Sequence, residues 1–275
     1  MRLLFCGDVV GRSGREAVLN ALPDLRRRLG LDFVVVNGEN SAHGFGITPK
    51  ICDEFFAGGA DVITLGNHAW DQREILSYID QEPRLLRPAN MQKKTPGRGS
   101  GVFEATRGRK VLVVQVIGRL FMEPLDDPFQ AVDAALERHR MGATVNAALL
   151  DIHADATSEK MALGHYVDGR VSLAVGSHSH VPTGDAQILP GGTAYQTDAG
   201  MSGDYDSVIG MRKEAAIYRF TRKLPGDKLG PADGEGTFCA VFVETDDATG
   251  LARQVSPVRI GPRLANIVPE LVTPL

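Results

Sequence analysis

The sequence predicts an α/β fold in which parallel strands carry polar residues at their carboxyl ends. Five short runs of apolar, β-forming residues stop at glycine or at polar side chains: residues 3–6, 33–36, 62–65, 148–150 and 171–175. Continuous apolar runs of this kind are typical of strands buried on both faces. Segments with helical periodicity separate the first three runs. Because open α/β sheets place their sites at strand ends, the residues that follow the five runs are candidate functional residues.

Composition limits the class of protein. The chain has 275 residues, 43% of them hydrophobic and 23% charged, which is ordinary for a globular protein, and we expect a single domain over residues 1–275. The net charge of −4 argues against a surface that wraps nucleic acid, although a metal could supply a local positive field for a small anion. Cys6, Cys52 and Cys239 are too few and too scattered for a disulfide framework or a CxxC zinc site. No signal peptide and no apolar run of membrane-spanning length is evident, so a cytoplasmic location is expected.

The first 65 residues read as a βαβαβ unit. A strand at residues 2–6 leads through a glycine-rich turn at 7–15 into a helix with an apolar stripe at Val18, Leu22, Leu25 and Leu29. The strand at 33–37 runs into a glycine-rich loop, after which Thr48 is placed to cap a helix with Pro49 at its first position. That helix should end near 58–59, before the strand at 62–65. A parallel sheet with right-handed crossovers follows.

After residue 65 the expected elements are shorter, and helices and strands no longer alternate regularly. We expect a short helix at 73–79, a hairpin of 102–105 with 111–117, and helices at 129–140 and from 154 to 163. Segments 186–189 and 193–196 have the pattern of strands in a second sheet, and 238–244 with 251–260 that of a closing hairpin. Residues 212–220 fit either a helix or an extended segment. The polar loop at 198–205 could contact substrate or another subunit.

Two groups of basic residues each allow two interpretations. Lys93, Lys94 and Arg98 lie in a Pro/Gly-rich stretch, where a solvated loop is favoured over a substrate clamp. Arg12 and Arg15, in the glycine-rich turn, either face the cleft at the strand ends or are solvated arginines of a first helical turn.

Histidines concentrate at the predicted strand ends. Four of the seven lie just past apolar runs, whereas His139 and His165 are read as surface or capping groups and His43 is left undecided. The four join a set of carboxylates and amides, and together these residues are Asp8, Glu39, Asn40, Asn67, His68, His153, His178 and His180. Such a mixture without thiolate suits Mn²⁺, Fe or Zn²⁺. Because there are too many donors for one ion, we expect two metal ions bridged by a carboxylate, an arrangement suited to phosphoester cleavage.

At this point the motifs resemble those of a known family. Gly7-Asp8, Gly38-Glu39-Asn40, Gly66-Asn67-His68, His153 and His178-Ser179-His180 are similar, in order and spacing, to the blocks of the calcineurin-like metallophosphoesterases. More narrowly, the stretches at 7–11, 37–41, 66–71, 87–90 and 156–160 resemble the bacterial YmdB-type branch, cyclic-nucleotide phosphodiesterases linked to RNA turnover and biofilm regulation. The resemblance implies a four-layer α/β/β/α sandwich with two central mixed β-sheets and the site at the sheet ends.

The resemblance also implies a role for each residue. Glu39 would bridge two metal ions. One ion would be completed by Asp8, Asn40 and His180, and the other by Asn67, His153 and His178. His68, next to a ligand but not one itself, would be the catalytic residue that stabilises the scissile phosphate or protonates the leaving oxygen.

Two positions depart from the wider pattern. The superfamily begins with Asp-x-His, but Val10 stands at the position of that histidine, and Asn40 is the expected replacement ligand. Asp155 stands where a glutamate is expected, and we expect it to support the metal ligands from behind.

The leading functional hypothesis is a dinuclear phosphodiesterase that hydrolyses small 2',3'- or 3',5'-cyclic nucleotides. A general phosphomonoesterase is the alternative within the same class, and a low-turnover, metal-containing regulatory protein in RNA turnover is the alternative from another class. The expected cofactors are two divalent or mixed-valence metal ions, iron or manganese before zinc. The expected partner is a small phosphodiester, with no extended nucleic-acid surface and no membrane. A homo-oligomer is compatible with the sequence.

Overall fold

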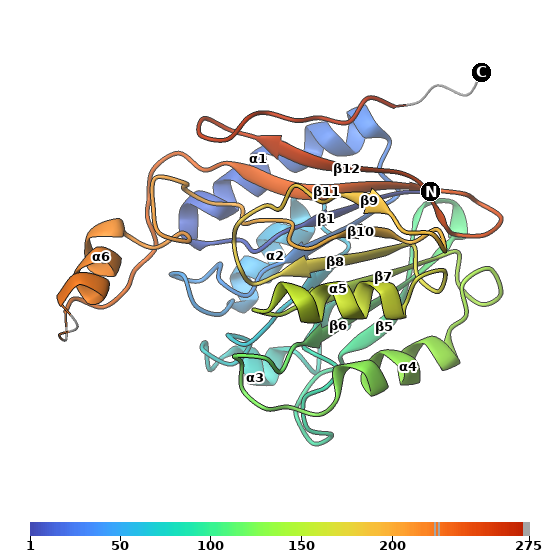
Figure 1. Cartoon of the computed structure of the whole chain (residues 1–275), viewed down its shortest axis with the longest axis horizontal. Helices are drawn as coiled ribbons and strands as arrows, with labels where there is room; N and C mark the ends of the chain where they lie inside the picture. Colours follow the sequence, from blue (N-terminus) through green and yellow to red (C-terminus); the bar gives the residue numbers. More distant parts are fainter. Residues whose placement is uncertain (223, 225, 272–275) are drawn as a thin grey trace.

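The computed structural model describes residues 1–222, 224 and 226–271, and among them two six-stranded β-sheets lie face to face (Figure 1). The first sheet has the order β12-β11-β1-β2-β3-β4 and comprises β1 (Arg2–Cys6), β2 (Phe33–Asn37), β3 (Val62–Thr64), β4 (Leu85–Leu86), β11 (Phe238–Thr245) and β12 (Ala252–Ile260). The second has the order β5-β6-β7-β8-β10-β9 and comprises β5 (Ser100–Glu104), β6 (Lys110–Ile117), β7 (Ala147–His153), β8 (Leu173–Ser177), β9 (Gln187–Ile188) and β10 (Ala194–Gln196).

Both sheets are mixed. Strands β1 to β4 pair in parallel, and so do β6, β7, β8 and β10. The antiparallel strands lie at the edges: β11 and β12 extend the first sheet beyond β1, while β5 and β9 border the second. The carboxyl ends of β1, β2 and β3 in one sheet therefore lie at the same edge as those of β7 and β8 in the other.

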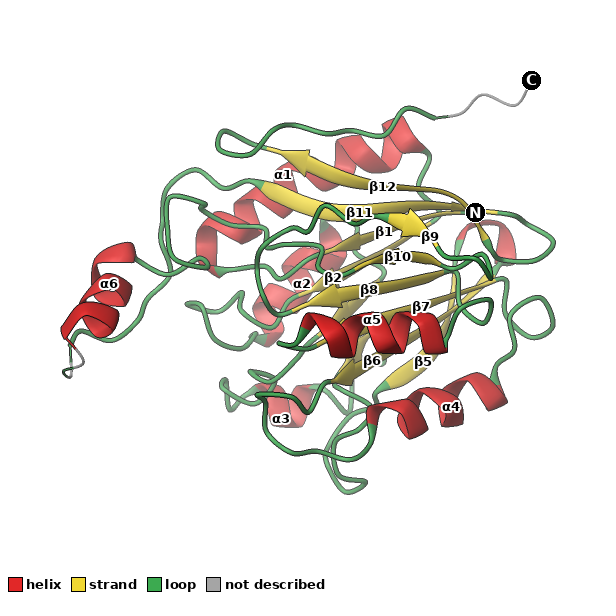
Figure 2. Cartoon of the chain, viewed as in Figure 1, coloured by secondary structure: helices red, strands yellow, loops and turns green. Residues whose placement is uncertain are grey.

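The core has three apolar layers because successive strand residues point to opposite faces. Leu3 and Phe5 pack between the sheets against residues such as Val113 of β6. Leu4 and Cys6 point the other way, toward α1 (Gly11–Leu29) and α2 (Pro49–Ala57). On the far side, α4 (Pro128–Arg138) and α5 (Thr157–Tyr166) cover the second sheet. Figure 2 shows the same order of helix, sheet, sheet and helix, which confirms the four-layer α/β/β/α sandwich.

Side-chain caps set the starts of two helices. The Thr48 hydroxyl accepts a hydrogen bond from the Ile51 backbone N–H at 3.3 Å, and Pro49 follows, as predicted. The helix expected at 129–140 instead begins at Pro128, because the Asp127 carboxylate accepts hydrogen bonds from the backbone N–H groups of the first turn. It ends at Arg138.

Three short elements complete the description. The helix expected at 73–79 is reduced to the single turn α3 (Ile75–Tyr78), and a 3₁₀ turn, η1 (Thr106–Gly108), joins β5 to β6. The undecided segment at 212–220 is the helix α6 (Lys213–Arg222), which projects from the body of the two sheets at the left of Figure 1. Of the helices in the described residues, none is long and apolar enough to cross a membrane.

Candidate metal centre

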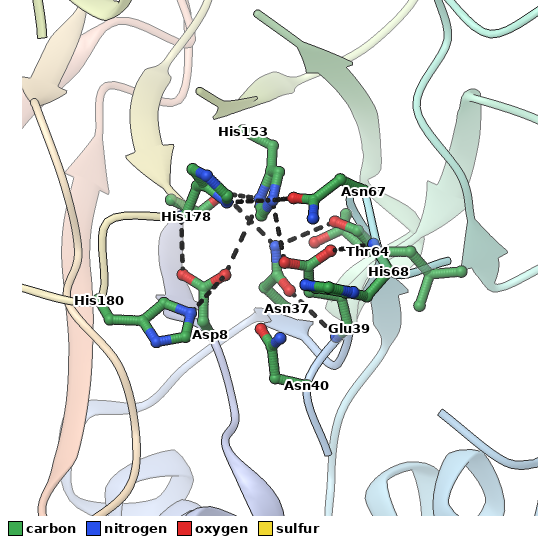
Figure 3. Close-up of polar contacts among 12 residues, drawn as sticks. Asp8, Asn37, Glu39, Asn40, Thr64, Asn67, His68, His153, His178 and His180 are labelled. Atoms are coloured by element: carbon green, nitrogen blue, oxygen red, sulfur yellow. Dashed lines mark hydrogen bonds and ion pairs between the residues drawn. The ribbon is translucent and has the colours of Figure 1, made fainter. Parts of the chain in front are cut away.

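The sequence-predicted site residues come together at the shared edge of the two sheets (Figure 3). The first sheet contributes the residues that follow β1, β2 and β3, and the second contributes those at the ends of β7 and β8; the complete set is Asp8, Glu39, Asn40, Asn67, His68, His153, His178 and His180. Each side chain begins within a few residues of a strand end, so rigid strands fix its position.

His153 is the centre of the closest group of donor atoms. Its Nε2 lies 2.9 Å from Glu39 Oε1, 2.9 Å from Asn67 Oδ1 and 3.1 Å from His178 Nδ1. Ligand atoms of Glu39, His153 and His178 all lie within 4.8 Å of one another. Oxygen and nitrogen atoms that converge at this spacing from three separate strand ends can surround one cation.

Asp8 and His180 form a second group beside the first (Figure 3). His180 Nε2 lies 3.9 Å from Asp8 Oδ1, and the His180 Nδ1–H donates a hydrogen bond to the Ile209 carbonyl at 2.8 Å. That bond leaves the lone pair on Nε2, the atom that faces Asp8. Asn40 lies beside this group in Figure 3 and is held by a hydrogen bond from its Nδ2 to the Gly44 carbonyl at 3.2 Å.

Unpaired acceptor atoms show that this donor set fits a cation. Among the described residues, Asp8 Oδ1, Glu39 Oε1 and Asn40 Oδ1 are buried and accept no hydrogen bond, although Glu39 Oε1 has the His153 ring 2.9 Å away as an ion-pair partner. Leaving a buried acceptor unpaired costs about 1 to 3 kcal/mol, and more when it is charged. A metal ion would satisfy all three acceptors at once, so the residues present are suited to the metal centre that the sequence predicts.

Electrostatics at the centre also favour positive charge. Burial would lower the pKa of His153, but the carboxylates of Glu39 and Asp8 outweigh it and raise the value to about 9. Burial and the neighbouring His153 lower the pKa of His178 to about 3, so His178 is neutral at physiological pH and keeps a lone pair for a metal. A cation at this point would take over the role of the proton on His153.

A buried carboxylate, which the sequence analysis did not single out, orients His153. Asp151, two residues earlier on β7, accepts a hydrogen bond on Oδ1 from Ser177 Oγ at 2.6 Å. Ser177 has only one proton to donate, so its oxygen accepts from His153 Nδ1–H, which lies 2.9 Å away. This Asp151–Ser177–His153 relay holds one proton of His153 on Nδ1, so a cation that replaces the other proton would meet the lone pair of Nε2, the atom that faces Glu39 and Asn67.

Asp151 is held by a ring of donors on its other oxygen. Asn37 Nδ2, Thr64 Oγ1 and Gln115 Nε2 donate to Asp151 Oδ2 at 3.2, 2.7 and 2.8 Å. Burial nevertheless raises the pKa of Asp151 to about 6.

His68 lies beside the donor groups but is held differently. Its backbone N–H donates to Glu39 Oε2 at 3.0 Å, while its ring Nδ1 pairs with Asp71 Oδ2 at 2.8 Å. The edge of Phe45 packs against the ring, with 5.1 Å between centroids, and 28% of the side chain is exposed. The Asp71 carboxylate therefore orients the His68 ring by direct contact. The sequence placed Asp71 in the motif at 66–71 but indicated no role for it.

The basic residues of the glycine-rich turn do not line the donor cluster. The Arg12 side chain is 65% exposed and lies 3.9 Å from Glu16, as expected of a solvated first-turn arginine. Arg15 Nη1 donates to the Ser41 carbonyl at 2.6 Å, so it secures the loop that follows β2.

The two departures from the superfamily pattern have different outcomes. Val10 is buried against Met201 and Met211, an apolar setting in which a metal-ligating histidine would have no place. Asp155 is exposed, so the expectation that it supports the ligands from behind is wrong. That supporting role falls to Asp151, which directly follows the apolar run 148–150 but was given no role from the sequence.

Comparison with known proteins identifies the relatives of this chain. A Bacillus subtilis (strain 168) protein named 2',3'-cyclic-nucleotide 2'-phosphodiesterase is 45% identical over 260 residues, which cover 94% of this chain and 97% of that protein. A crystal structure of a hypothetical protein from Thermus thermophilus superposes with a TM-score of 0.88 at 43% identity, covering 95% and 99% of the two chains. A Mycoplasma pneumoniae structure described as a novel phosphatase gives a TM-score of 0.88 at 32% identity, covering 95% and 93%.

The family assignment extends over nearly the whole chain. The model of the family described as YmdB-like protein matches residues 4–258, a span that contains every residue of the candidate metal centre. The fold is the metallophosphoesterase fold that the motifs implied. The strand-end donors and the two mixed sheets agree with these relatives, and the chain belongs to the YmdB-like family.

Proposed function

We propose that this protein hydrolyses 2',3'-cyclic nucleotides at a centre of two metal ions bridged by Glu39. The observation that carries the proposal is the group of buried, unpaired acceptor atoms on Asp8, Glu39 and Asn40, next to the histidines of the second sheet. The enzyme class rests on the relatives: the chain is a phosphoric diester hydrolase, in keeping with the name of its Bacillus subtilis relative.

The site residues divide into metal ligands and one proton donor. Asn67, His153 and His178 would hold one ion, and Asp8, Asn40 and His180 the other. Bound metal ions of this kind lower the pKa of a coordinated water and neutralise phosphoryl oxygens. The donor set of imidazole, carboxylate and amide favours iron or manganese over a soft, thiolate-bound metal.

His68 is the residue that we assign to proton transfer. Its Nδ1 is held by the Asp71 carboxylate, which fixes the orientation of the ring. Its partial exposure leaves the ring accessible to a substrate entering from solvent. Nε2 is then the atom that would give a proton to the ribose oxygen released when the cyclic diester opens.

The test is steady-state turnover at defined metal loading on a panel of phosphates. The panel contains 2',3'-cyclic AMP, 3',5'-cyclic AMP, bis(p-nitrophenyl) phosphate and p-nitrophenyl phosphate, each assayed with Mn²⁺, Fe²⁺ or Zn²⁺. We expect the highest kcat/KM on the 2',3'-cyclic nucleotide and complete loss of activity after chelation. Preference for the monoester would instead support a general phosphomonoesterase. Turnover too slow to measure on every substrate would support the regulatory alternative.

A further inference from the structure

A buried ion pair lies directly behind the His178–His180 turn. Lys160 on α5 and Asp198 after β10 have fully buried side chains, and their Nζ and Oδ2 atoms are 2.7 Å apart. A Cβ atom on Gly176, two residues before His178, would lie 2.7 Å from Lys160 Cδ and would overlap the Thr197 carbonyl. The lysine stem therefore fits tightly beneath the end of β8.

Asp198 connects this ion pair to the residue between the two histidines. Its Oδ2 accepts hydrogen bonds from the Ser179 backbone N–H at 3.1 Å and from the Ser179 hydroxyl at 2.6 Å. Its Oδ1 accepts from the Gly200 backbone N–H at 2.8 Å. One carboxylate thus fixes both the turn that carries His178 and His180 and the loop that packs over it.

The turn needs such support because its backbone is strained. His178 has φ of 93° and His180 has φ of 63°, both in the region that favours glycine. A non-glycine residue held in such a conformation costs about 1 to 3 kcal/mol and persists only where its surroundings determine it. Here the Ser179 contacts with Asp198 lie midway between the two strained residues.

A neutral residue would serve poorly in place of Asp198. Hydrogen bonds to a charged acceptor are roughly twice as strong as those between neutral groups. A buried carboxylate without a counter-ion, however, would be strongly destabilising, and Lys160 removes that penalty. The ion pair therefore lets a fully charged acceptor hold the turn inside the protein.

We propose that Lys160 and Asp198 are positioning residues that hold the His178–Ser179–His180 turn so that both imidazoles face the candidate metal centre. The proposal rests on the metal-dependent function proposed above, and it assigns a role to the start of the 198–205 loop other than substrate or subunit contact. It also explains the lysine of the 156–160 motif, whose neighbour Glu159 accepts hydrogen bonds from the Arg119 and Leu120 backbone N–H groups in the loop after β6.

The test measures the affinity of each variant for Mn²⁺ by calorimetry, together with its melting temperature in chelator. Ser179→Ala removes the hydroxyl contact but keeps the ion pair. Lys160→Met combined with Asp198→Asn removes both charges and leaves neither unpaired. We expect both variants to bind Mn²⁺ about 10- to 100-fold more weakly, the usual effect of losing support behind metal ligands. Ser179→Thr, which keeps the hydroxyl, should restore the affinity.

Arg26→Met is the matched control. Arg26 on α1 pairs with Asp61, which precedes β3 and so lies at the opposite edge of the sheet. This variant should melt at a lower temperature with unchanged Mn²⁺ affinity. Wild-type affinity in Ser179→Ala and in the double variant would overturn the positioning role. If the double variant does not fold, Ser179→Ala alone decides. Failure of the wild-type protein to bind Mn²⁺, Fe²⁺ or Zn²⁺ would instead refute the proposed function itself.

Discussion

Replacing Asp151 by asparagine should separate metal affinity from stability. The asparagine oxygen can take the position of Oδ2, where Asn37, Thr64 and Gln115 donate. Its NH₂ group then faces Ser177 and donates to it. Ser177 must therefore turn its own proton toward His153 Nδ1. The proton of a neutral His153 moves to Nε2, and the lone pair no longer faces the metal centre.

The expected magnitudes follow from the relay and from the pKa of Asp151. Loss of orientation behind a metal-ligating histidine typically weakens metal binding 10- to 100-fold, or about 1.4 to 2.7 kcal/mol. Stability should change in the opposite direction. Burial raises the pKa of Asp151 from 3.8 to about 6, so the charged form is disfavoured in the folded, metal-free protein by about 3 kcal/mol. A neutral asparagine removes that penalty.

The sign of the pH dependence distinguishes this account from a general loss of structure. Folding raises the pKa of Asp151, so below pH 4 the group is protonated in both the folded and the unfolded state and does not affect stability. As the pH rises, its charge destabilises the folded state increasingly, and this effect is complete above about pH 6. In chelator, Asp151→Asn should therefore gain up to about 3 kcal/mol over the wild type at pH 8 and little at pH 4. Chemical denaturation at the two pH values measures this difference.

Thr64→Val is a control for the same network. It removes one hydrogen bond to Asp151 and leaves Ser177 in place, so it should lower the free energy of unfolding by about 1.5 to 3 kcal/mol without reversing the relay. Wild-type Mn²⁺ affinity in Asp151→Asn would show that the relay does not set the tautomer of His153. A loss of several kcal/mol at pH 8 would refute the burial argument.

The other predictions concern the donor groups and their neighbours. Glu39→Gln should lose at least one of two copurifying metal ions, because an amide lacks the negative charge of a bridging carboxylate; elemental analysis that finds both ions in the variant would contradict the bridging role. His68→Ala should keep both ions and lower kcat on a cyclic diester by roughly 10² to 10⁴-fold, with less effect on an activated leaving group that needs no proton. If metal is lost in proportion to activity, His68 is a ligand. Asp71→Asn should lower kcat less than His68→Ala, because the His68 ring keeps its place in the site but loses the carboxylate that orients it; a wild-type kcat in Asp71→Asn would exclude this role for Asp71. Arg12→Ala should leave kcat/KM unchanged, whereas Arg15→Ala should reduce stability by about 1 kcal/mol in chemical denaturation; a fall in kcat/KM for Arg12→Ala would place that side chain in the cleft after all.

Local sequence signals predicted the strand ends well, and the contacts behind them poorly. Asp8, Glu39 and His178 each follow an apolar run closely, so the pattern alone indicated that they would meet at one edge. Asp151 also follows such a run directly, but the pattern indicated no role for it, because a carboxylate inside a strand becomes informative only when the partners that surround it are known. The pairing of His68 with Asp71 depends on a turn conformation that composition does not specify.

The pairing of strands that are far apart in the sequence was the other feature that could not be predicted. The hairpin of β11 and β12 was predicted from the strand pattern of its two segments and from the turn residues between them. Its attachment to β1, however, joins residues more than 200 positions apart. Local propensity carries no information about such a partner. Residues 212–220 remained undecided because in the short helix α6 only Ala216 is buried, and so few buried positions give no clear helical or strand periodicity. By contrast, the missed start of α4 at Asp127-Pro128 could have been found from capping rules alone.

The position of β1 between β2 and β11 has a consequence for the order of events during synthesis. β2 emerges from the ribosome soon after β1, but β11 begins only at Phe238, well after the last candidate metal ligand, His180. Chains are made from the N-terminus at about 5 to 20 residues per second, so the strand that leads to Asp8 spends roughly 10 to 45 seconds with one edge unpaired. All the candidate ligands have been synthesised by the last part of that interval. The β1 backbone that orients Asp8 is nevertheless paired on one side only, and the Gly7 N–H still lacks its partner, the Cys239 carbonyl. The nascent chain thus acquires its donor atoms before the framework that orients them, and closure of the first sheet by β11 is the step that gives Asp8 its final place.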